Sequence, residues 1–180
     1  SRLHKEAPAV RLAKISKKIE ATLGITVSIG LSYNKFLAKI GSELEKPRGF
    51  SVIGESDVES ILQNKSIAKI LGVGKKTKLI LETHGIKHIK DILKHDASHL
   101  KEILGSFGQT LWLLAQGIDN RKISSNKPPK SFSCEQTFEI NQFQFEILKS
   151  YLWDLSEKIS FRLKNSSLVP KKLSLKLKSK

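Results

Sequence analysis

Two glycines followed by lysines are the residues of this 180-residue chain whose types and spacing best suggest chemistry. A short helix is predicted to lead into Gly72-Val73-Gly74, and a second helix to begin near Lys75. Glycine tolerates positive φ, so the turn between these helices can be tight. The amides of Val73, Gly74 and Lys75 are then expected to point outward at a helix N-terminus, where the helix dipole favours an anion. Further positive charge comes from Lys76 and Lys78.

This glycine turn resembles a helix–hairpin–helix motif, which binds a nucleic-acid phosphate without reading the bases. The alternative is a plain turn between two helices, and the Gly-x-Gly spacing alone does not separate the two. The apolar helix before the turn and the basic residues after it favour the phosphate-binding interpretation.

The charge of the whole chain points to the same class of partner. There are 32 Lys and Arg against 17 Asp and Glu, which gives a net charge of +15. The excess is spread along the chain, with clusters at 75–78, 121–130 and 171–180. A polyanion, most naturally nucleic acid, fits this pattern because each neutralised phosphate releases counterions. The alternative is a lysine-rich surface that only keeps the protein in solution.

Composition excludes several other classes. One cysteine, Cys134, is too few for a disulfide scaffold or a multi-cysteine zinc site, and it falls on the apolar face of a predicted strand, which favours a structural role. No apolar run approaches the roughly 20 residues that span a bilayer, and the N-terminus lacks the apolar stretch of a secretion signal. We therefore expect a soluble, intracellular, basic protein.

The histidines and carboxylates predict no catalytic or metal site. His84 and His88 are four residues apart, as are His95 and His99, but Gly85 interrupts the first pair, so exposed helix-end positions are expected. The close acidic pair, Asp57 and Glu59, opens a short helix, where acids complement the dipole. Trp112 and Trp153 lie on apolar stripes of predicted helices and are expected in the core.

The elements that must position these residues follow from hydrophobic periodicity. A helix over 5–23, a strand over 25–31 and a helix that Ser32 or Asn34 can cap and that ends before Lys46-Pro47 form an α/β fragment. Short helices then follow at 55–64, 75–84, 98–104 and 108–116. Beyond a polar, basic linker, we expect a strand at 131–138, a helix at 142–164 and a strand at 173–177. The predicted fold class is α+β.

Four segments, in this order, resemble Y-family translesion DNA polymerases of the bacterial polymerase IV type. They read SIGLSYNKFLAKIGSELEKP at 28–47, ILGVGK at 70–75, FG with AQGID at 107–119, and KSFSCEQTF at 130–138. The resemblance implies that 1–50 is the C-terminal part of a palm and 51–117 an all-helical thumb with a helix–hairpin–helix. It implies that 118–130 is a basic linker and 131–180 the first, incomplete half of an α/β little finger.

The resemblance also implies roles for individual residues. Lys46, before Pro47, matches the lysine that contacts the triphosphate of the incoming nucleotide. The thumb motif that holds the DNA backbone is matched by Gly72, Val73 and Gly74, with Lys75 and Lys76 beside it. The little-finger strand that lies against DNA is matched by Lys130, Ser131 and Ser133.

The family's Mg²⁺-binding carboxylates come from blocks that precede anything in this sequence. We therefore expect a fragment of a DNA-directed DNA polymerase, a nucleotidyltransferase, with no catalytic residue and no metal ligand of its own and without activity alone. The resemblance implies primer–template DNA and a deoxynucleoside triphosphate as partners, a sliding clamp for the full-length parent, no membrane, a monomer and a bacterial cytoplasm.

Two other interpretations remain open from the sequence. A stand-alone helix–hairpin–helix DNA-binding module without catalysis would explain the glycine turn, but it would not need Lys46-Pro47 or the segment 130–138. A basic RNA-binding protein would prefer exposed aromatics on a strand face, where only Phe132 and Phe138 are candidates.

Overall fold

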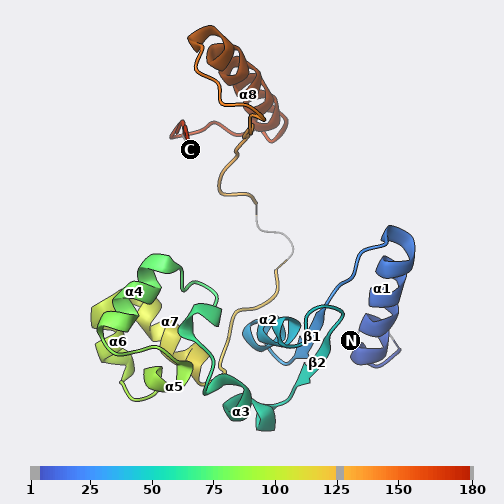
Figure 1. The fold of residues 1–180 in the computed structure, drawn as a ribbon, viewed down its shortest axis with the longest axis vertical. Helices are drawn as coiled ribbons and strands as arrows, with labels where there is room; N and C mark the ends of the chain where they lie inside the picture. Colours follow the sequence, from blue (N-terminus) through green and yellow to red (C-terminus); the bar gives the residue numbers. More distant parts are fainter. Residues whose placement is uncertain (1–4, 125–127, 179–180) are drawn as a thin grey trace. The chain divides into compact units, whose positions relative to one another are not determined.

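The computed structural model describes residues 5–124 and 128–178, and the chain divides into two compact units, Ser1–Ile123 and Ser124–Lys180 (Figure 1). Residues 125–127 of the predicted linker and Lys180 of the last basic cluster lie outside the described residues.

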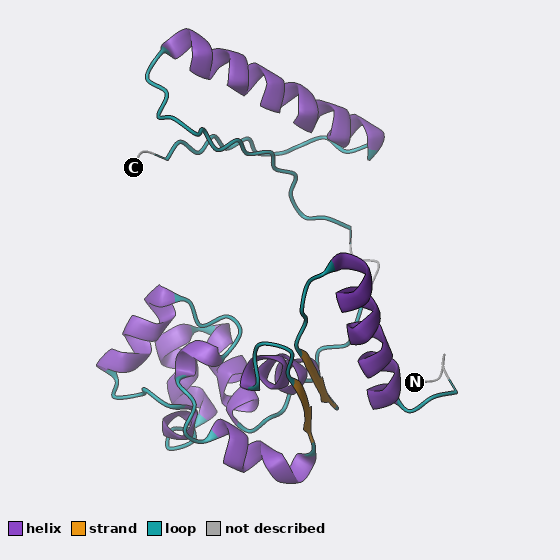
Figure 2. Ribbon diagram, turned by 45° about the vertical axis from the view of Figure 1, so that its right-hand side comes forward, coloured by secondary structure: helices purple, strands orange, loops and turns teal. Residues whose placement is uncertain are grey.

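The first unit opens with an α/β segment (Figure 2). Its elements are α1 (Pro8–Leu23), β1 (Ile29–Ser32), α2 (Lys35–Leu44) and β2 (Phe50–Ile53). The strands β1 and β2 pair in parallel, with Ile29 opposite Phe50 and Ser32 opposite Ile53. The strand predicted at 25–31 is therefore wrong in its first half, because the ladder begins only where a partner strand is present. The partner, β2, was not predicted.

Helix α2 packs closely on β1 because Gly30 has no side chain. A Cβ atom at Gly30 would lie 2.0 Å from the carbonyl oxygen of Ala38 and 2.3 Å from the amide nitrogen of Ser42. Of the two predicted caps, Asn34 is the one used, since its side chain accepts a hydrogen bond from Leu37 N–H.

The remainder of the first unit is helical. Its elements are η1 (Glu55–Asp57), α3 (Val58–Leu62), η2 (Ile67–Lys69), α4 (Lys75–Thr83), α5 (Ile89–Ile92), α6 (Ala97–Leu104) and α7 (Ser106–Ala115). The four predicted helices are present, whereas the short α5 was not predicted. Buried side chains of these helices form one hydrophobic cluster with Phe36, Leu37 and Ile40 of α2. Trp112 packs against this cluster and donates from Nε1 to the carbonyl of His95, as its apolar stripe predicted.

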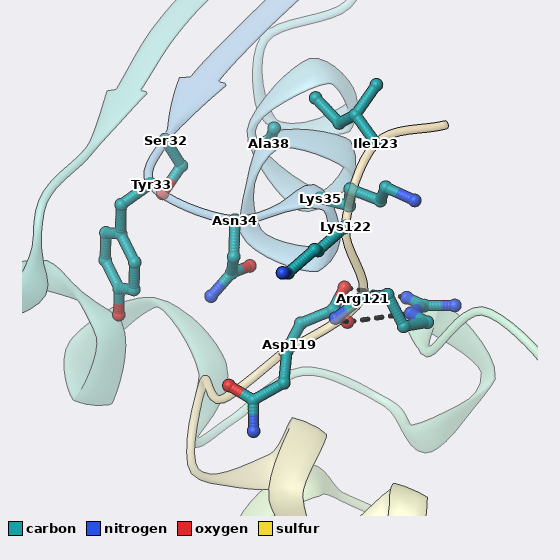
Figure 3. Close-up of a pocket in the computed structure, with 10 residues that line it drawn as sticks. Ser32, Tyr33, Asn34, Lys35, Ala38, Asp119, Arg121, Lys122 and Ile123 are labelled. Atoms are coloured by element: carbon teal, nitrogen blue, oxygen red, sulfur yellow. Dashed lines mark hydrogen bonds and ion pairs between the residues drawn. The ribbon is translucent and has the colours of Figure 1, made fainter. Parts of the chain in front are cut away.

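A buried carboxylate ties the end of the helical part to the start of α2. Asp119 follows α7, and its side chain is 2% exposed. It accepts a hydrogen bond of 3.1 Å from Phe36 N–H. The Arg121 guanidinium donates two further hydrogen bonds to it, at 2.7 and 2.8 Å (Figure 3). Asn34 adds a hydrogen bond of 2.7 Å to the carbonyl of Gly117. Segments 83 residues apart in sequence are thus joined by one charge-assisted and one neutral hydrogen bond.

The second unit contains α8 (Phe145–Asn165), which confirms the helix predicted at 142–164. The strands predicted at 131–138 and 173–177 are wrong, since neither segment is in a ladder among residues 128–178. The prediction for Trp153 is also wrong, because this side chain is 69% exposed. A strand needs a hydrogen-bonded neighbour, and alternation of apolar residues does not by itself supply one.

The architecture is thus a mixed α+β fold, with a small parallel sheet and many helices, as predicted at that level. Among the described residues, no helix has both the length and the apolar character that crossing a membrane requires.

The Asp119 contacts predict a measurable loss of stability when the charge is removed. Hydrogen bonds to a charged group contribute about 1.5–3 kcal/mol, so Asp119→Asn is expected to lower the free energy of unfolding by an amount in this range. Denaturant unfolding of the full chain at pH 7 measures it. An unchanged free energy of unfolding would show that the contact does not hold the two segments together.

The same variant tests how the stability of the chain depends on pH. Hydrogen bonds from Arg121 lower the pKa of Asp119. The stabilisation is then present above the unfolded-state value, near 4, and is lost as the pH falls through the lower folded-state value. Asp119→Asn is expected to flatten this part of the acid unfolding curve.

Candidate nucleic-acid interface

The turn at residues 72–74 is built on buried apolar side chains. Ile67 of η2, Ile70 and Val73 are at most 9% exposed, and they hold the turn against the hydrophobic cluster. Gly72 has φ of +102°, and a Cβ atom there would lie 2.8 Å from the Phe107 ring. This position therefore requires glycine for both its conformation and its packing.

Gly74 has a different role from the one the sequence suggested. Its φ is −84°, so it needs no left-handed conformation, and a Cβ atom there would meet nothing within 4 Å. Gly74 is the N-cap of α4 and provides no side-chain cap. The backbone at the start of α4 is therefore open to an approaching ligand.

One of the three amides predicted to point outward is already used. Val73 N–H donates to the carbonyl of Ile70 at 3.0 Å, and the Val73 side chain is buried. The prediction is wrong for the Val73 amide, because the hydrogen bond of this amide closes the turn after η2. The N–H groups of the first helical turn, beginning at Lys75, have no carbonyl of their own helix to bind.

Lysines crowd the positive end of the α4 dipole. Lys75 and Lys76 are exposed first-turn residues, and the first turn contains no acid. Neither lysine has an ion-pair partner among the described residues, whereas Lys78 pairs with Glu82 at 3.6 Å. Positive charge at a helix N-terminus is unfavourable to the helix, so these two lysines are not explained by helix stability.

Lys46, the predicted nucleotide contact, lies two residues beyond α2 and is held by an acid. Its Nζ atom is 2.7 Å from Oε1 of Glu43, and the same oxygen is 2.7 Å from Nζ of Lys39. Hydrogen bonds from Lys39 and Lys46 lower the pKa of Glu43 to about 2. The Lys46 side chain is 54% exposed, so this exposed ion pair orients it only weakly.

Lys130, Ser131 and Ser133 belong to the second unit and are exposed. Although no strand forms, burial still alternates here, since Phe132 and Cys134 are partly buried. Arg162 of α8 fixes this segment: its guanidinium carbon lies 5.5 Å from the centre of the Phe132 ring, and it donates to the carbonyl of Ser133 at 2.9 Å. The two serine side chains are left facing solvent.

The structure thus places the exposed Gly72 and Gly74, with the buried Val73 between them, directly before Lys75 and Lys76 of α4. Lys46 lies beyond the end of a different element, α2. Sequence reasoning missed the partner of Lys46, Glu43, and the contacts of Asp119. A carboxylate two residues before an arginine, as in Asp119 and Arg121, is the signal that was available for the second of these.

His84, His88 and His99 are exposed near helix ends, as predicted, whereas His95 is partly buried. His84 caps the end of α4, and His88 precedes α5. The rings of His95 and His99 are stacked at 5.1 Å. Residues 5–124 and 128–178 contain no group of three or more His, Cys, Asp or Glu side chains that could hold a metal ion.

Two family models match the chain at its two ends. The impB/mucB/samB family matches residues 2–43, and the impB/mucB/samB family C-terminal domain matches residues 129–180.

Relatives extend this similarity over nearly the whole chain. DNA polymerase IV of Brucella melitensis biotype 1 is 45% identical over 178 residues, which cover 99% of this chain and 40% of that protein. DNA polymerase IV 1 of Mesorhizobium japonicum is 43% identical, covering 99% and 41%. DNA polymerase IV of Clostridioides difficile is 39% identical over 172 residues, covering 94% and 47%. The chain spans less than half the length of these three relatives. The chain is thus similar to the impB/mucB/samB family at both of its ends and, over nearly its whole length, to proteins named DNA polymerase IV.

Proposed function

We propose that this chain supplies DNA-backbone binding to a translesion DNA polymerase, with residues 51–117 acting as the thumb and the glycine turn as its helix–hairpin–helix. The observation that carries the proposal is the exposed start of α4, where open backbone at Gly74 lies beside the unpaired Lys75 and Lys76. Backbone amides and lysines together suit a phosphate and carry no information about the base.

The position of the lysines supports a ligand rather than a structural purpose. A cation in the first turn of a helix costs about 0.3–1 kcal/mol where an acid would stabilise by the same amount. A bound phosphate offsets the cost of the lysines, because it places a negative charge at the positive end of the α4 dipole.

Lys46 is proposed to contact the triphosphate of the incoming nucleotide. Its partner Glu43 holds the ammonium group at the end of α2, and a triphosphate carries more negative charge than this one carboxylate. The exposed pair can therefore exchange Glu43 for the nucleotide at little cost. Lys130, Ser131 and Ser133 are proposed to meet the DNA backbone from the second unit.

The activity of the whole protein is proposed to be template-directed nucleotide addition past damaged bases, with primer–template DNA and deoxynucleoside triphosphates as its substrates. The described residues do not supply a site for the Mg²⁺ that such chemistry uses. We infer that this chain binds and orients DNA, and that the metal ligands lie in another part of the polymerase. A sliding clamp as partner, a monomeric state and a cytoplasmic location belong to the same proposal.

A stand-alone helix–hairpin–helix module is less well supported. Such a module would account for residues 67–83 alone, whereas the relatives match 94–99% of the chain in one alignment each. The segments around Lys46 and Lys130 are included in these matches.

Gly74→Leu is predicted to weaken the binding of duplex DNA about tenfold, the equivalent of about 1.4 kcal/mol, by placing a side chain where the phosphate approaches. The loss is expected to be equal for duplexes of unrelated sequence, because only the backbone is contacted. Fluorescence anisotropy with labelled primer–template duplexes measures it.

The matched control is Ala21→Leu on α1, which adds comparable bulk at another exposed position of the same unit. It is expected to bind DNA like the unmodified chain. Both variants should fold, because a Cβ atom at Gly74 meets nothing within 4 Å and Ala21 is exposed. A loss confined to one DNA sequence would contradict a phosphate contact.

Lys75→Gln/Lys76→Gln is predicted to separate binding from stability. Removing two cations from the first turn of α4 should raise the free energy of unfolding by about 0.6–2 kcal/mol in total, since each costs about 0.3–1 kcal/mol there. The same variant should bind DNA more weakly and with a smaller salt dependence. Denaturant unfolding and anisotropy are measured on the same sample. A variant that loses stability and binding together would show that the lysines are structural.

A further inference from the structure

The turn that carries Lys46 spans residues 45–49, between the end of α2 and the start of β2. At its last residue, Gly49 N–H donates to Oγ of Ser28 at 3.2 Å, and the Gly49 carbonyl accepts a hydrogen bond of 2.8 Å from the first amide of β1. A Cβ atom at Gly49 would lie 2.3 Å from the carbonyl oxygen of Glu45, so the two ends of the turn are in contact. These backbone contacts fix the end of the turn that leads into β2.

Arg48, inside this turn, adopts a backbone conformation that does not suit its residue type. Its φ is +60°, in the left-handed region, where glycine is favoured over residues that have a Cβ atom. The guanidinium of Arg48 forms an ion pair with the carboxylate of Glu20, near the C-terminal end of α1. The backbone thus gives no reason for an arginine at this position, whereas the side chain has a specific partner on another element.

The two cations of the turn are paired with acids on two different helices. Nζ of Lys46 lies 2.7 Å from Oε1 of Glu43 on α2, whereas Arg48 pairs with Glu20 on α1. The Lys46 and Arg48 side chains are 54% and 67% exposed. An exposed ion pair shifts an equilibrium by about fivefold at most, which adds little to the stability of a fold but is measurable in the binding of a ligand. We therefore expect the effect of these pairs in the conformation of the turn.

We propose that Arg48 is a positioning residue for Lys46, and that its ion pair with Glu20 holds the turn so that the Lys46 ammonium group is presented to the triphosphate. The inference rests on the proposed contact of Lys46 with the incoming nucleotide. A turn that is held before binding loses less conformational freedom when the nucleotide binds, and this favours binding. Arg48 acts through the turn, while its guanidinium stays with Glu20.

The role of Arg48 decides the sign of the effect of a change at Glu20. If Arg48 positions the turn, Glu20→Gln frees the turn and weakens binding of the triphosphate, although it removes a negative charge. If Arg48 contacts the triphosphate directly, or if only the total charge matters, the same variant strengthens binding, because an acid that repels the anion is gone. The two roles are thus separated by one substitution.

The test compares Glu20→Gln with the matched control Glu6→Gln in the full chain. The Glu20 and Glu6 side chains are 39% and 38% exposed, and each forms an ion pair with a basic side chain, Arg48 and Lys14 respectively. Binding of dATP is followed by the NMR signals of the Lys46 side chain. Thermal unfolding of every variant checks the fold.

A second readout needs no nucleotide. Hydrogen bonds from Lys39 and Lys46 lower the pKa of Glu43 to about 2. The ¹³C signal of the Glu43 carboxyl group, followed as the pH is lowered, therefore reports whether Lys46 stays beside it. Lys46→Gln is the reference variant, because it shows the full rise in the pKa of Glu43 that loss of the Lys46 contact causes.

Glu20→Gln is expected to weaken dATP binding about two- to fivefold, whereas Glu6→Gln should not weaken it. Glu20→Gln should also raise the pKa of Glu43, by less than Lys46→Gln does. A general charge effect has the opposite sign, since removing a nearby acid lowers the pKa of a carboxyl group. Arg48→Gly should weaken dATP binding to the same extent and unfold at the same or a higher temperature, because glycine adopts the positive φ at no cost.

Stronger or unchanged dATP binding in Glu20→Gln would overturn the proposal, and so would an unchanged pKa of Glu43 in this variant. An Arg48→Gly variant that unfolds at a lower temperature but binds dATP normally would make Arg48 a structural residue. If the unmodified chain does not bind dATP while Glu20→Gln still raises the pKa of Glu43, the proposed nucleotide contact fails and the positioning of Lys46 by Arg48 stands.

Discussion

The buried carboxylate of Asp119 is the contact on which the arrangement of the first unit depends. Burying a carboxylate is costly unless hydrogen-bonding partners replace water, and here Arg121 and Phe36 N–H do so. The chain that leaves α7 is thereby fixed to the start of α2. Without this contact, the hydrophobic cluster would still join the two parts, but nothing polar would set the path of residues 119–123.

Signals local in sequence predicted the structure well. Asn34 caps α2 because its short amide reaches the Leu37 amide three residues later, and such a contact depends on no distant residue. The turn at Gly72 was predicted for the same reason, since only glycine adopts its positive φ at no cost. The prediction was too simple at Gly74, where the same residue type provides open space and not an unusual conformation.

Features that require a distant partner were not predictable in this way. The strand β2 exists because β1 pairs with it, and the alternation at 131–138 forms no strand because no ladder partner is present among residues 128–178. The Asp119 contacts join residues 83 apart, so neither segment reveals them alone.

The position of a charge is better evidence of a ligand than the amount of charge. A net charge of +15 is compatible with a surface that only keeps a protein soluble. Lys75 and Lys76, however, lie in the first turn of α4, where the helix dipole makes a cation unfavourable. A solubilising lysine would be as effective at the opposite end of this helix, where it would also be stabilising. Helix α4 therefore carries a cost that folding alone does not recover, and an anion bound at its start would remove it.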